Sequence, residues 1–183
     1  IVQFRGAEKE WQSIANEDES LSASKIRFDK NSFSTLKRSE DYEWIEYADG
    51  SICLIKCFNK NVQNLDFTAT FPDATTIEIG PRCFIENEND LFSKIDERIV
   101  RFDAEATFNC SHSLFYEVVF SDNIEYIGDD AFGYGSFYFK QPDKPESWGK
   151  TYYNAYFYWY SETSNTDGQH WHYVDGKPTV WTE

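Results

Sequence analysis

A short pattern of apolar and small residues recurs along the middle of the chain. Three segments align when their starts are set 23 and 25 residues apart: IGPRCFIEN (79–87), FDAEATFNC (102–110) and IGDDAFGYG (127–135). Their first position is apolar: Ile79, Phe102 and Ile127. Their fifth position is small: Cys83, Ala106 and Ala131. Recurrence at such a period indicates a repeat architecture.

A unit of about 23–25 residues cannot bury its own apolar face and has to stack on its neighbours. The sequence therefore predicts a mainly β fold with short helices, in which about three stacked turns form a right-handed solenoid. Each turn would hold a short strand whose alternate side chains face the interior, so Glu117 and Val119 would face outward. The residues predicted to be buried are Ile79, Val118, Phe120, Ile127, Ala131 and Phe132.

Other patterns flank the repeats. Residues 42–57 predict two strands joined at Asp49-Gly50, a strong hairpin signal, so we expect a hairpin that caps the first repeat. Residues 31–41 are polar and predict a linker. After Gly135 comes a Pro-rich stretch with one helical turn, and then three aromatic segments separated by Asp-Gly turns. These predict a β-meander that closes the other end.

The composition narrows the classes of partner. Asp and Glu number 32 against 17 Lys and Arg among 183 residues, which gives a net charge of −15. Nucleic acids and anionic membranes require basic surface, so neither is an expected partner. No apolar run approaches the roughly 20 residues of a membrane span. The sequence has no recognisable signal peptide and no Met, so we expect a mature or excised piece of a longer protein.

Candidate chemistry is sparse. The sequence has no nucleophile elbow, P-loop, dinucleotide fingerprint or H-E-x-x-H motif, so we expect neither an enzyme nor a cofactor. Cys53 and Cys57 would lie roughly 13 Å apart along one strand, too far for a disulfide. With Cys83 and Cys110 they are expected to be free thiols packed as small apolar groups.

Two constellations invite a metal or a glycosidase interpretation. His170 and His172 share strand parity, but no third ligand is fixed by the sequence, so no metal site is predicted. The acidic pair Asp129-Asp130 and the group at 86–90 are interpreted as solvated turn residues, because a repeat corner provides neither a catalytic cleft nor a calcium loop.

Aromatic residues are the feature with most functional potential. Eight of them fall within thirteen residues: Trp148, Tyr152, Tyr153, Tyr156, Phe157, Tyr158, Trp159 and Tyr160. Strand alternation would bury half of them and expose the other half. Exposed rings would suit protein recognition or stacking on sugars, whereas a purely structural cap would need neither.

Several stretches resemble the BspA-like leucine-rich-repeat proteins of bacterial surfaces, whose repeat is similar to I-P-x-x-V-x-x-I-G-x-x-A-F-x-x-C. The repeat matches are FPDATTIEIGPRCF (71–84), EATFNC (105–110) and FSDNIEYIGDDAF (120–132). The terminal matches are FRGAEKEWQSI (4–14), LSASKIRFD (21–29) and the closing segment 158–181. Departures are Thr107 where Phe is usual, Gly135 where Cys is common, and a middle turn (91–102) two residues short.

The resemblance implies five segments. They are a closing unit of a preceding array (1–30, with a short helix over 8–15), a linker (31–41), a capping hairpin (42–63), leucine-rich repeats (64–135) and an aromatic cap (136–183).

The resemblance also implies a non-enzymatic adhesion module, secreted or attached to a bacterial surface, that binds host, neighbouring-cell or matrix proteins. The lack of a long apolar run predicts that it does not insert into membranes. Candidate binding residues are Thr68, Thr70, Glu117, Val119, Glu125, Trp159 and Trp171. One alternative is a carbohydrate-binding or spacer segment beside a surface enzyme outside this chain, with ring stacking on exposed tyrosines and tryptophans, among them Trp159 and Trp171. The other is a scaffold without a ligand.

Overall fold

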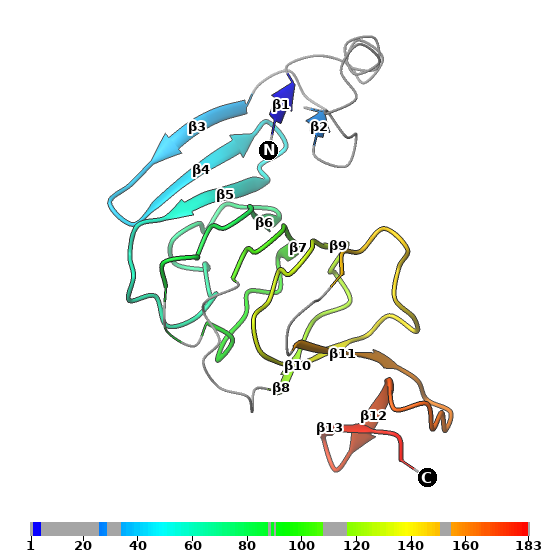
Figure 1. Cartoon of the computed structure of the whole chain (residues 1–183). Coiled ribbons are helices and arrows are strands. Elements are labelled where there is room, and N and C mark those ends of the chain that lie inside the picture. Colours follow the sequence, from blue (N-terminus) through cyan, green and yellow to red (C-terminus); the bar gives the residue numbers. More distant parts are fainter. Residues whose placement is uncertain are drawn as a thin grey trace.

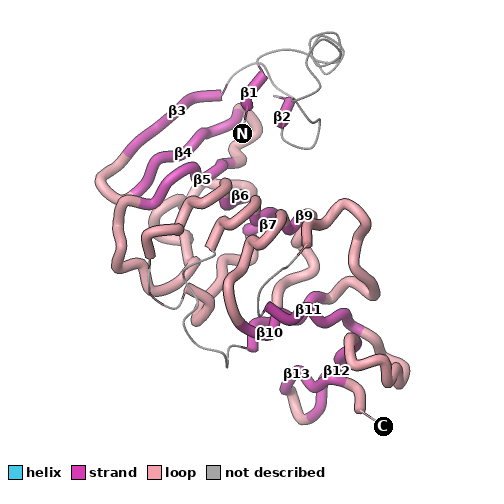
Figure 2. Tube along the Cα trace, viewed as in Figure 1, coloured by secondary structure: helices cyan, strands magenta, loops and turns pink. Residues whose placement is uncertain are grey.

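A computed structural model describes residues 2–4, 26–28, 34–87, 89, 91–107, 117–150 and 155–182. These residues form strands, turns and loops and contain no helix (Figure 2). The prediction of a mainly β fold is confirmed. The prediction of short helices is not confirmed. The helical turn expected after Gly135 is an irregular loop over 140–150, and the helix expected over 8–15 lies outside the described residues.

The strands fall into three sheets (Figure 1). The smallest pairs β1 (Val2–Phe4) with β2 (Ile26–Phe28). The first large sheet has the order β3 (Ser34–Arg38), β4 (Tyr42–Tyr47), β5 (Ile52–Cys57), β6 (Ile77–Ile79), β7 (Ile99–Phe102), β9 (Tyr126–Ile127). The second has the order β13 (Lys177–Val180), β12 (His170–Val174), β11 (Ala155–Tyr160), β10 (Gly135–Phe139), β8 (Glu117–Val119).

The predicted hairpin is present at the start of the first large sheet. Strands β4 and β5 pair antiparallel around Asp49-Gly50, where Gly50 has a φ of 82°, the left-handed region that favours glycine. The linker prediction is wrong over 34–38, because β3 pairs antiparallel with β4 along its whole length. The side chains of residues 35–38 are exposed, so no apolar alternation marks this strand in the sequence.

The repeat alignment is reproduced by a parallel ladder through β5, β6, β7 and β9. One row of paired residues runs Leu54, Ile79, Phe102 and Ile127 across the four strands, and each of them is fully buried. The three residues predicted to share the first repeat position are therefore neighbours in space. A solvent-free row of this kind buries apolar area continuously from one turn to the next.

The backbone then bends in the same way in each repeated segment, at a position that we call the corner. The amide groups of Gly80, Asp103, Gly128 and Gly149 donate to carbonyl oxygens of the preceding turn at 2.7–2.8 Å. The fourth repeat position has a left-handed backbone in every copy: Arg82 (φ 57°), Glu105 (φ 53°) and Asp130 (φ 48°). The small fifth residues Cys83, Ala106 and Ala131 are buried directly behind it, which explains why the alignment has small side chains there.

The aromatic cap departs from the predicted meander. Strands β12 and β13 form an antiparallel hairpin at Asp175-Gly176, as expected. Strands β11 and β12, in contrast, are parallel, as are β10 with β11 and β8 with β10. Residues 161–169 therefore return across the sheet before β12 begins, and Asp167-Gly168 belongs to this crossover rather than to a hairpin.

One hydrophobic core joins the two large sheets. Phenylalanine rings fill it, with Phe120 stacked on Phe139 at a centroid distance of 5.0 Å and Phe102 packed on Phe132 at the same distance. All the residues predicted to be buried are buried: Ile79, Val118, Phe120, Ile127, Ala131 and Phe132. Cys53, Cys57 and Cys83 are buried, as expected for thiols packed as small apolar groups, and Cys110 lies outside the described residues.

The small fifth position can be tested directly. Ala131→Asp places a carboxylate in the core without a partner, and we expect it to lower the free energy of unfolding by about 3–5 kcal/mol. Ala104→Asp is the matched control, because Ala104 is exposed in a neighbouring corner. Urea unfolding followed by tryptophan fluorescence compares the two variants, and equal midpoints would contradict the corner geometry.

The close approach of neighbouring turns gives a second test. A Cβ atom on Gly128 would lie 2.4 Å from the Ala104 nitrogen and 2.6 Å from the Asp103 carbonyl carbon. Because both are backbone atoms, we expect Gly128→Ala to destabilise by about 3 kcal/mol. Gly168→Ala meets no atom within 4 Å and bears only the cost of its positive φ, about 1 kcal/mol. Thermal unfolding of both variants should rank them in this order.

Candidate functional site

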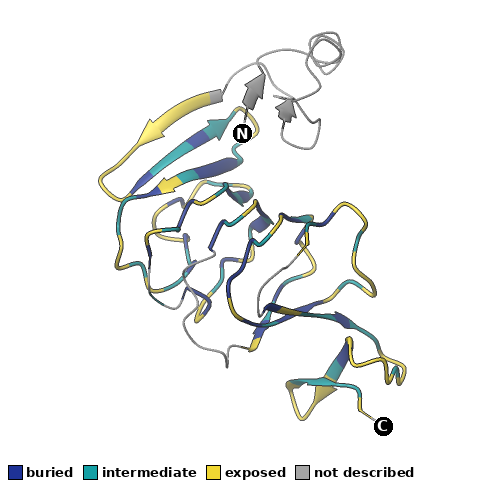
Figure 3. Cartoon of the chain, in the orientation of Figure 1, coloured by how far each residue is buried: buried dark blue, intermediate teal, exposed yellow. Residues whose placement is uncertain are grey.

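Strand β11 separates its aromatic side chains by parity. Phe157 and Trp159 pack into the core, so Tyr156, Tyr158 and Tyr160 project from the opposite face of the sheet. Figure 3 shows how burial changes along this strand and into β12. Tyr156 is the most open of the three, with 57% of its surface exposed. The alternation predicted for this segment is therefore real.

In-register pairing places further aromatic rings on the same face of the sheet as these tyrosines. Tyr138 of β10 pairs with Tyr158 and stacks on it, with centroids 5.0 Å apart and planes 20° apart. Tyr160 pairs with Trp171 of β12, and their centroids are 5.1 Å apart. Tyr173 packs edge-on against Trp171 at 5.0 Å. We call this layer the tyrosine face; its members are Tyr138, Tyr156, Tyr158, Tyr160, Trp171 and Tyr173.

The tyrosine face has a buried floor and open ends. Trp171 is fully buried, and its indole Nε1–H donates to the Phe139 carbonyl oxygen at 2.9 Å. Tyr138 is also buried. Tyr156 and Tyr173, by contrast, are 57% and 46% exposed. The exposed Tyr173 ring is thus packed against a buried side chain, so it would lose less conformational entropy when a partner binds.

Two of the predicted binding residues lie beside this face. Strand β8 pairs with β10 so that Glu117 is opposite Ser136 and Val119 is opposite Tyr138. Glu117 is exposed and Val119 is half-buried. Burial first, and then the negative charge of Glu117, raise the pKa of the Tyr138 hydroxyl to about 12. The structure therefore brings Glu117 and Val119 together with the tyrosines.

The predicted positions Thr68, Thr70 and Glu125 do not join the tyrosine face. Thr68 and Thr70 are exposed but lie in the loop between β5 and β6, not in a strand. Asp66 accepts hydrogen bonds from both the amide and the hydroxyl of Thr68, at 3.1 and 2.7 Å, and this turn replaces the expected strand. Glu125 lies before β9, and its carbonyl oxygen accepts the Trp148 indole hydrogen bond at 3.0 Å.

The two predicted tryptophans do not present rings to a ligand. Trp159 is only 4% exposed and packs on Phe139 and Trp148 in the core. Trp171 is 0% exposed beneath the tyrosines. The expectation of ring stacking on these two residues is therefore wrong. Strand alternation in β11 predicts this burial, because Trp159 points to the same side of the sheet as the core residue Phe157, whereas Tyr156 and Tyr160 point to the other side.

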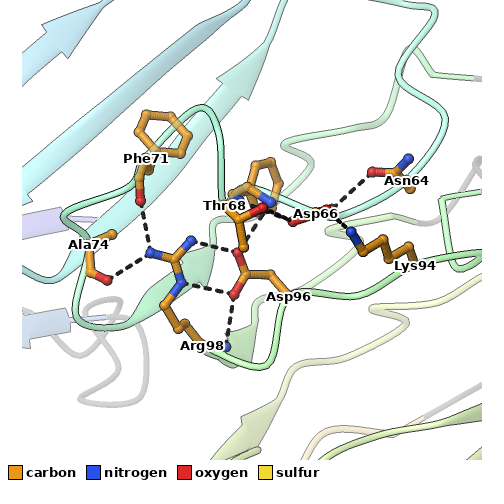
Figure 4. A network of polar contacts seen from close by, with 9 residues as sticks. Asn64, Asp66, Thr68, Phe71, Ala74, Lys94, Asp96 and Arg98 are labelled. Carbon is orange, nitrogen blue, oxygen red and sulfur yellow. Dashed lines mark hydrogen bonds and ion pairs between the residues drawn. The ribbon is translucent and has the colours of Figure 1, made fainter.

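A polar network elsewhere proves to be structural (Figure 4). The buried carboxylate of Asp96 receives Nε–H and Nη2–H of Arg98 at 2.9 and 2.7 Å. Nη1 of Arg98 donates to the carbonyl oxygens of Phe71 and Ala74 at 2.8 and 2.9 Å. Burial alone would raise the pKa of the Asp96 carboxyl, but the hydrogen bonds from Arg98 outweigh it and lower the pKa.

The same network also ties Asp66 to Lys94. That contact and the hydrogen bonds from Thr68 hold the pKa of the Asp66 carboxyl below its ordinary value. The Asp66 and Asp96 carboxylates are thus both engaged in fixing the 64–74 loop on the next turn. Neither is poised for proton transfer at neutral pH.

The histidines and the acidic corners are likewise engaged. His170 is buried, with Nε2 2.9 Å from the Pro142 carbonyl oxygen and Nδ1 2.7 Å from an Asp167 oxygen. His172 stacks on Trp181 at 3.5 Å. The Asp129 carboxylate accepts a hydrogen bond from the Lys150 amide at 2.8 Å.

Within the described part of the chain, no cluster of three His, Cys, Asp or Glu side chains has metal-binding geometry. Glu88 and Asp90 lie outside that part.

No family model, curated protein or solved structure matches this chain. The described residues include no helix long and apolar enough to cross a membrane.

The buried Tyr138 hydroxyl predicts an alkaline transition. Its pKa is raised from an ordinary value of 10 to about 12 in the folded chain, so the folded state holds a proton that the unfolded state releases. Stability is therefore full below pH 10 and falls as the pH rises toward 12. Tyr138→Phe should make this fall shallower, as measured by urea unfolding at pH 8 to 11.

The control variant for this prediction is Tyr156→Phe, which removes an exposed hydroxyl from the same face. Other tyrosines, including Tyr42, whose pKa burial also raises, maintain part of the decline in every variant. Identical pH profiles for Tyr138→Phe and Tyr156→Phe would show that Glu117 and burial do not act on Tyr138 as described.

Proposed function

We propose that this chain is a non-enzymatic protein-binding module and that the tyrosine face is its binding surface. The observation that carries the proposal is the layer of rings on one face of the second large sheet. Tyr173 is exposed against the buried Trp171, and Tyr156 is exposed on the same face. Tyrosine gives large contact area at low conformational cost and retains a hydroxyl for hydrogen bonding. Rigid aromatic residues of this kind dominate protein interfaces.

We further propose that the module is a BspA-like leucine-rich-repeat solenoid of about three turns, in a secreted or surface-attached bacterial protein that acts in adhesion. Support comes from the parallel row Leu54, Ile79, Phe102, Ile127 and from the left-handed corner repeated in each copy. Val2 and Ile26 also pair in parallel, and their separation along the sequence is similar to the repeat length of about 23–25 residues. It supports the interpretation of residues 1–30 as the closing unit of a preceding array.

The carbohydrate-binding alternative ranks second. It expects ring stacking on exposed tyrosines and tryptophans, and the two tryptophans named for it, Trp159 and Trp171, are buried. Tyr156 and Tyr173 are the exposed rings of the face, and the edge-to-face pair Tyr160 and Trp171 lies between them. A glycan hit that depends on Tyr156 would reverse this ranking.

The proposal is tested by applying the purified chain to arrays of extracellular and matrix proteins and of glycans at physiological salt. We expect saturable binding to at least one protein on the array. The double variant Tyr156→Ala/Tyr173→Ala should weaken this binding by about 2 kcal/mol or more, roughly 30-fold, because exposed aromatic anchors are interface hot spots. Leu36→Ala is the control: it truncates an apolar side chain that is 63% exposed on β3 of the other large sheet.

Three outcomes would contradict the proposal. Binding only to glycans would favour the carbohydrate alternative, and silence on both arrays would favour a scaffold without a ligand. A protein hit that Leu36→Ala weakens more than the double variant would move the binding surface to the first large sheet. Near-UV circular dichroism of each variant confirms that the fold is intact before binding is compared.

A further inference from the structure

We propose that the tyrosine face takes a cationic polypeptide segment, with an arginine side chain seated between Glu117 and Tyr156. This inference rests on the proposed protein-binding function and names the chemistry of the partner. The seat is one row of the second large sheet: Glu117 of β8 pairs with Ser136 of β10, which pairs with Tyr156 of β11.

The dimensions of this row suit a guanidinium group. Neighbouring strands lie about 4.8 Å apart, so Glu117 and Tyr156 are separated by roughly 10 Å across Ser136. The serine side chain is too short to fill the space between a carboxylate and a phenol ring. A planar cation placed above Ser136 can face the Tyr156 ring on one side and the Glu117 carboxylate on the other. Arginine has the length and the flat, multidentate head that such a seat requires.

The molecule uses the same chemistry within itself. The guanidinium carbon of Arg101 lies 3.8 Å from the centroid of the Tyr126 ring, while its Nε donates to the Asp103 carboxylate at 2.7 Å. An arginine held between a tyrosine ring and a carboxylate is therefore a stable arrangement in this fold. The proposed seat offers the same two groups, Tyr156 and Glu117, without an arginine of the described chain between them.

The net negative charge of the chain favours a positively charged partner. The chain carries a net charge of −15, so a basic segment is attracted from a distance while an acidic one is repelled. A second copy of this chain brings the same negative charge and is a poor occupant for the face. Desolvation at a half-buried aromatic surface strengthens the attraction between a cation and a ring.

The test uses three fluorescein-labelled peptides of one length and the intact chain. The first alternates arginine with serine, the second replaces each arginine by neutral citrulline, and the third by lysine. We expect fluorescence anisotropy to give at least about tenfold tighter binding for arginine than for citrulline, and a few-fold advantage over lysine. Binding of the arginine peptide should weaken as salt is raised.

Point variants locate the seat. Glu117→Gln and Tyr156→Ala should each weaken the arginine peptide about fivefold, whereas Leu36→Ala on the other large sheet should leave the Kd unchanged. Glu117→Gln keeps the shape of an exposed side chain, so a loss of folding does not confuse the result. Tyr156→Phe retains the ring and should restore most of the affinity lost in Tyr156→Ala.

Two results would overturn the inference. Equal affinities for the arginine and citrulline peptides would show that the face does not select a cation. Equal affinities for arginine and lysine, with no effect of either Glu117→Gln or Tyr156→Ala, would reduce the attraction to unspecific electrostatics. If the array partner still depends on Tyr156 and Tyr173 in either case, protein binding at the tyrosine face stands and only the partner chemistry fails.

Discussion

The constraint on which the structure depends is that the backbone groups of each repeated segment find hydrogen-bond partners on the neighbouring segment. The parallel strands of the first large sheet are short, from two residues in β9 to six in β5, so strand pairing alone leaves many peptide groups of the corners in need of partners. The corners solve this by bonding to one another, as Gly128 does to the Phe102 carbonyl oxygen at 2.7 Å. Such an approach leaves no room for a Cβ atom at Gly128 or Gly149.

This backbone stacking fixes the spacing of side chains on both sides of the sheets. Parallel, in-register strands place like positions about 4.8 Å apart, a distance that suits stacked rings. Inside, Phe120 and Phe139 stack at 5.0 Å; outside, Tyr138 and Tyr158 stack at the same distance. The aromatic core and the tyrosine face are therefore two consequences of one register.

The sequence predicts the fold best where the backbone conformation allows only certain residue types. The repeat was visible because the corners demand a small fifth residue, and the β4–β5 hairpin because Asp49-Gly50 suits a tight turn. Strand β3 was missed because its exposed side chains carry no apolar alternation. The direction of β12 was missed because an Asp-Gly turn signal does not say whether the chain reverses or crosses over. Residue type alone makes Trp159 a candidate binding residue, but strand alternation puts it on the same side of β11 as Phe157, which faces the core.

The same parity decides whether the tyrosine face exists at all. A shift of β11 by one residue against β10 would turn Phe157 and Trp159 outward and drive three tyrosine hydroxyls into the core without partners, at a cost of several kcal/mol. Phe137 and Phe139 oppose that shift, because they stack with Phe132 and Trp159 at 4.5 and 5.3 Å and so hold β10 in phase. The tyrosine face is thus maintained by residues that no ligand would touch. Substitutions at Phe137 or Phe139 should alter binding through the register of β11, whereas substitutions at Tyr156 should alter it through contact alone.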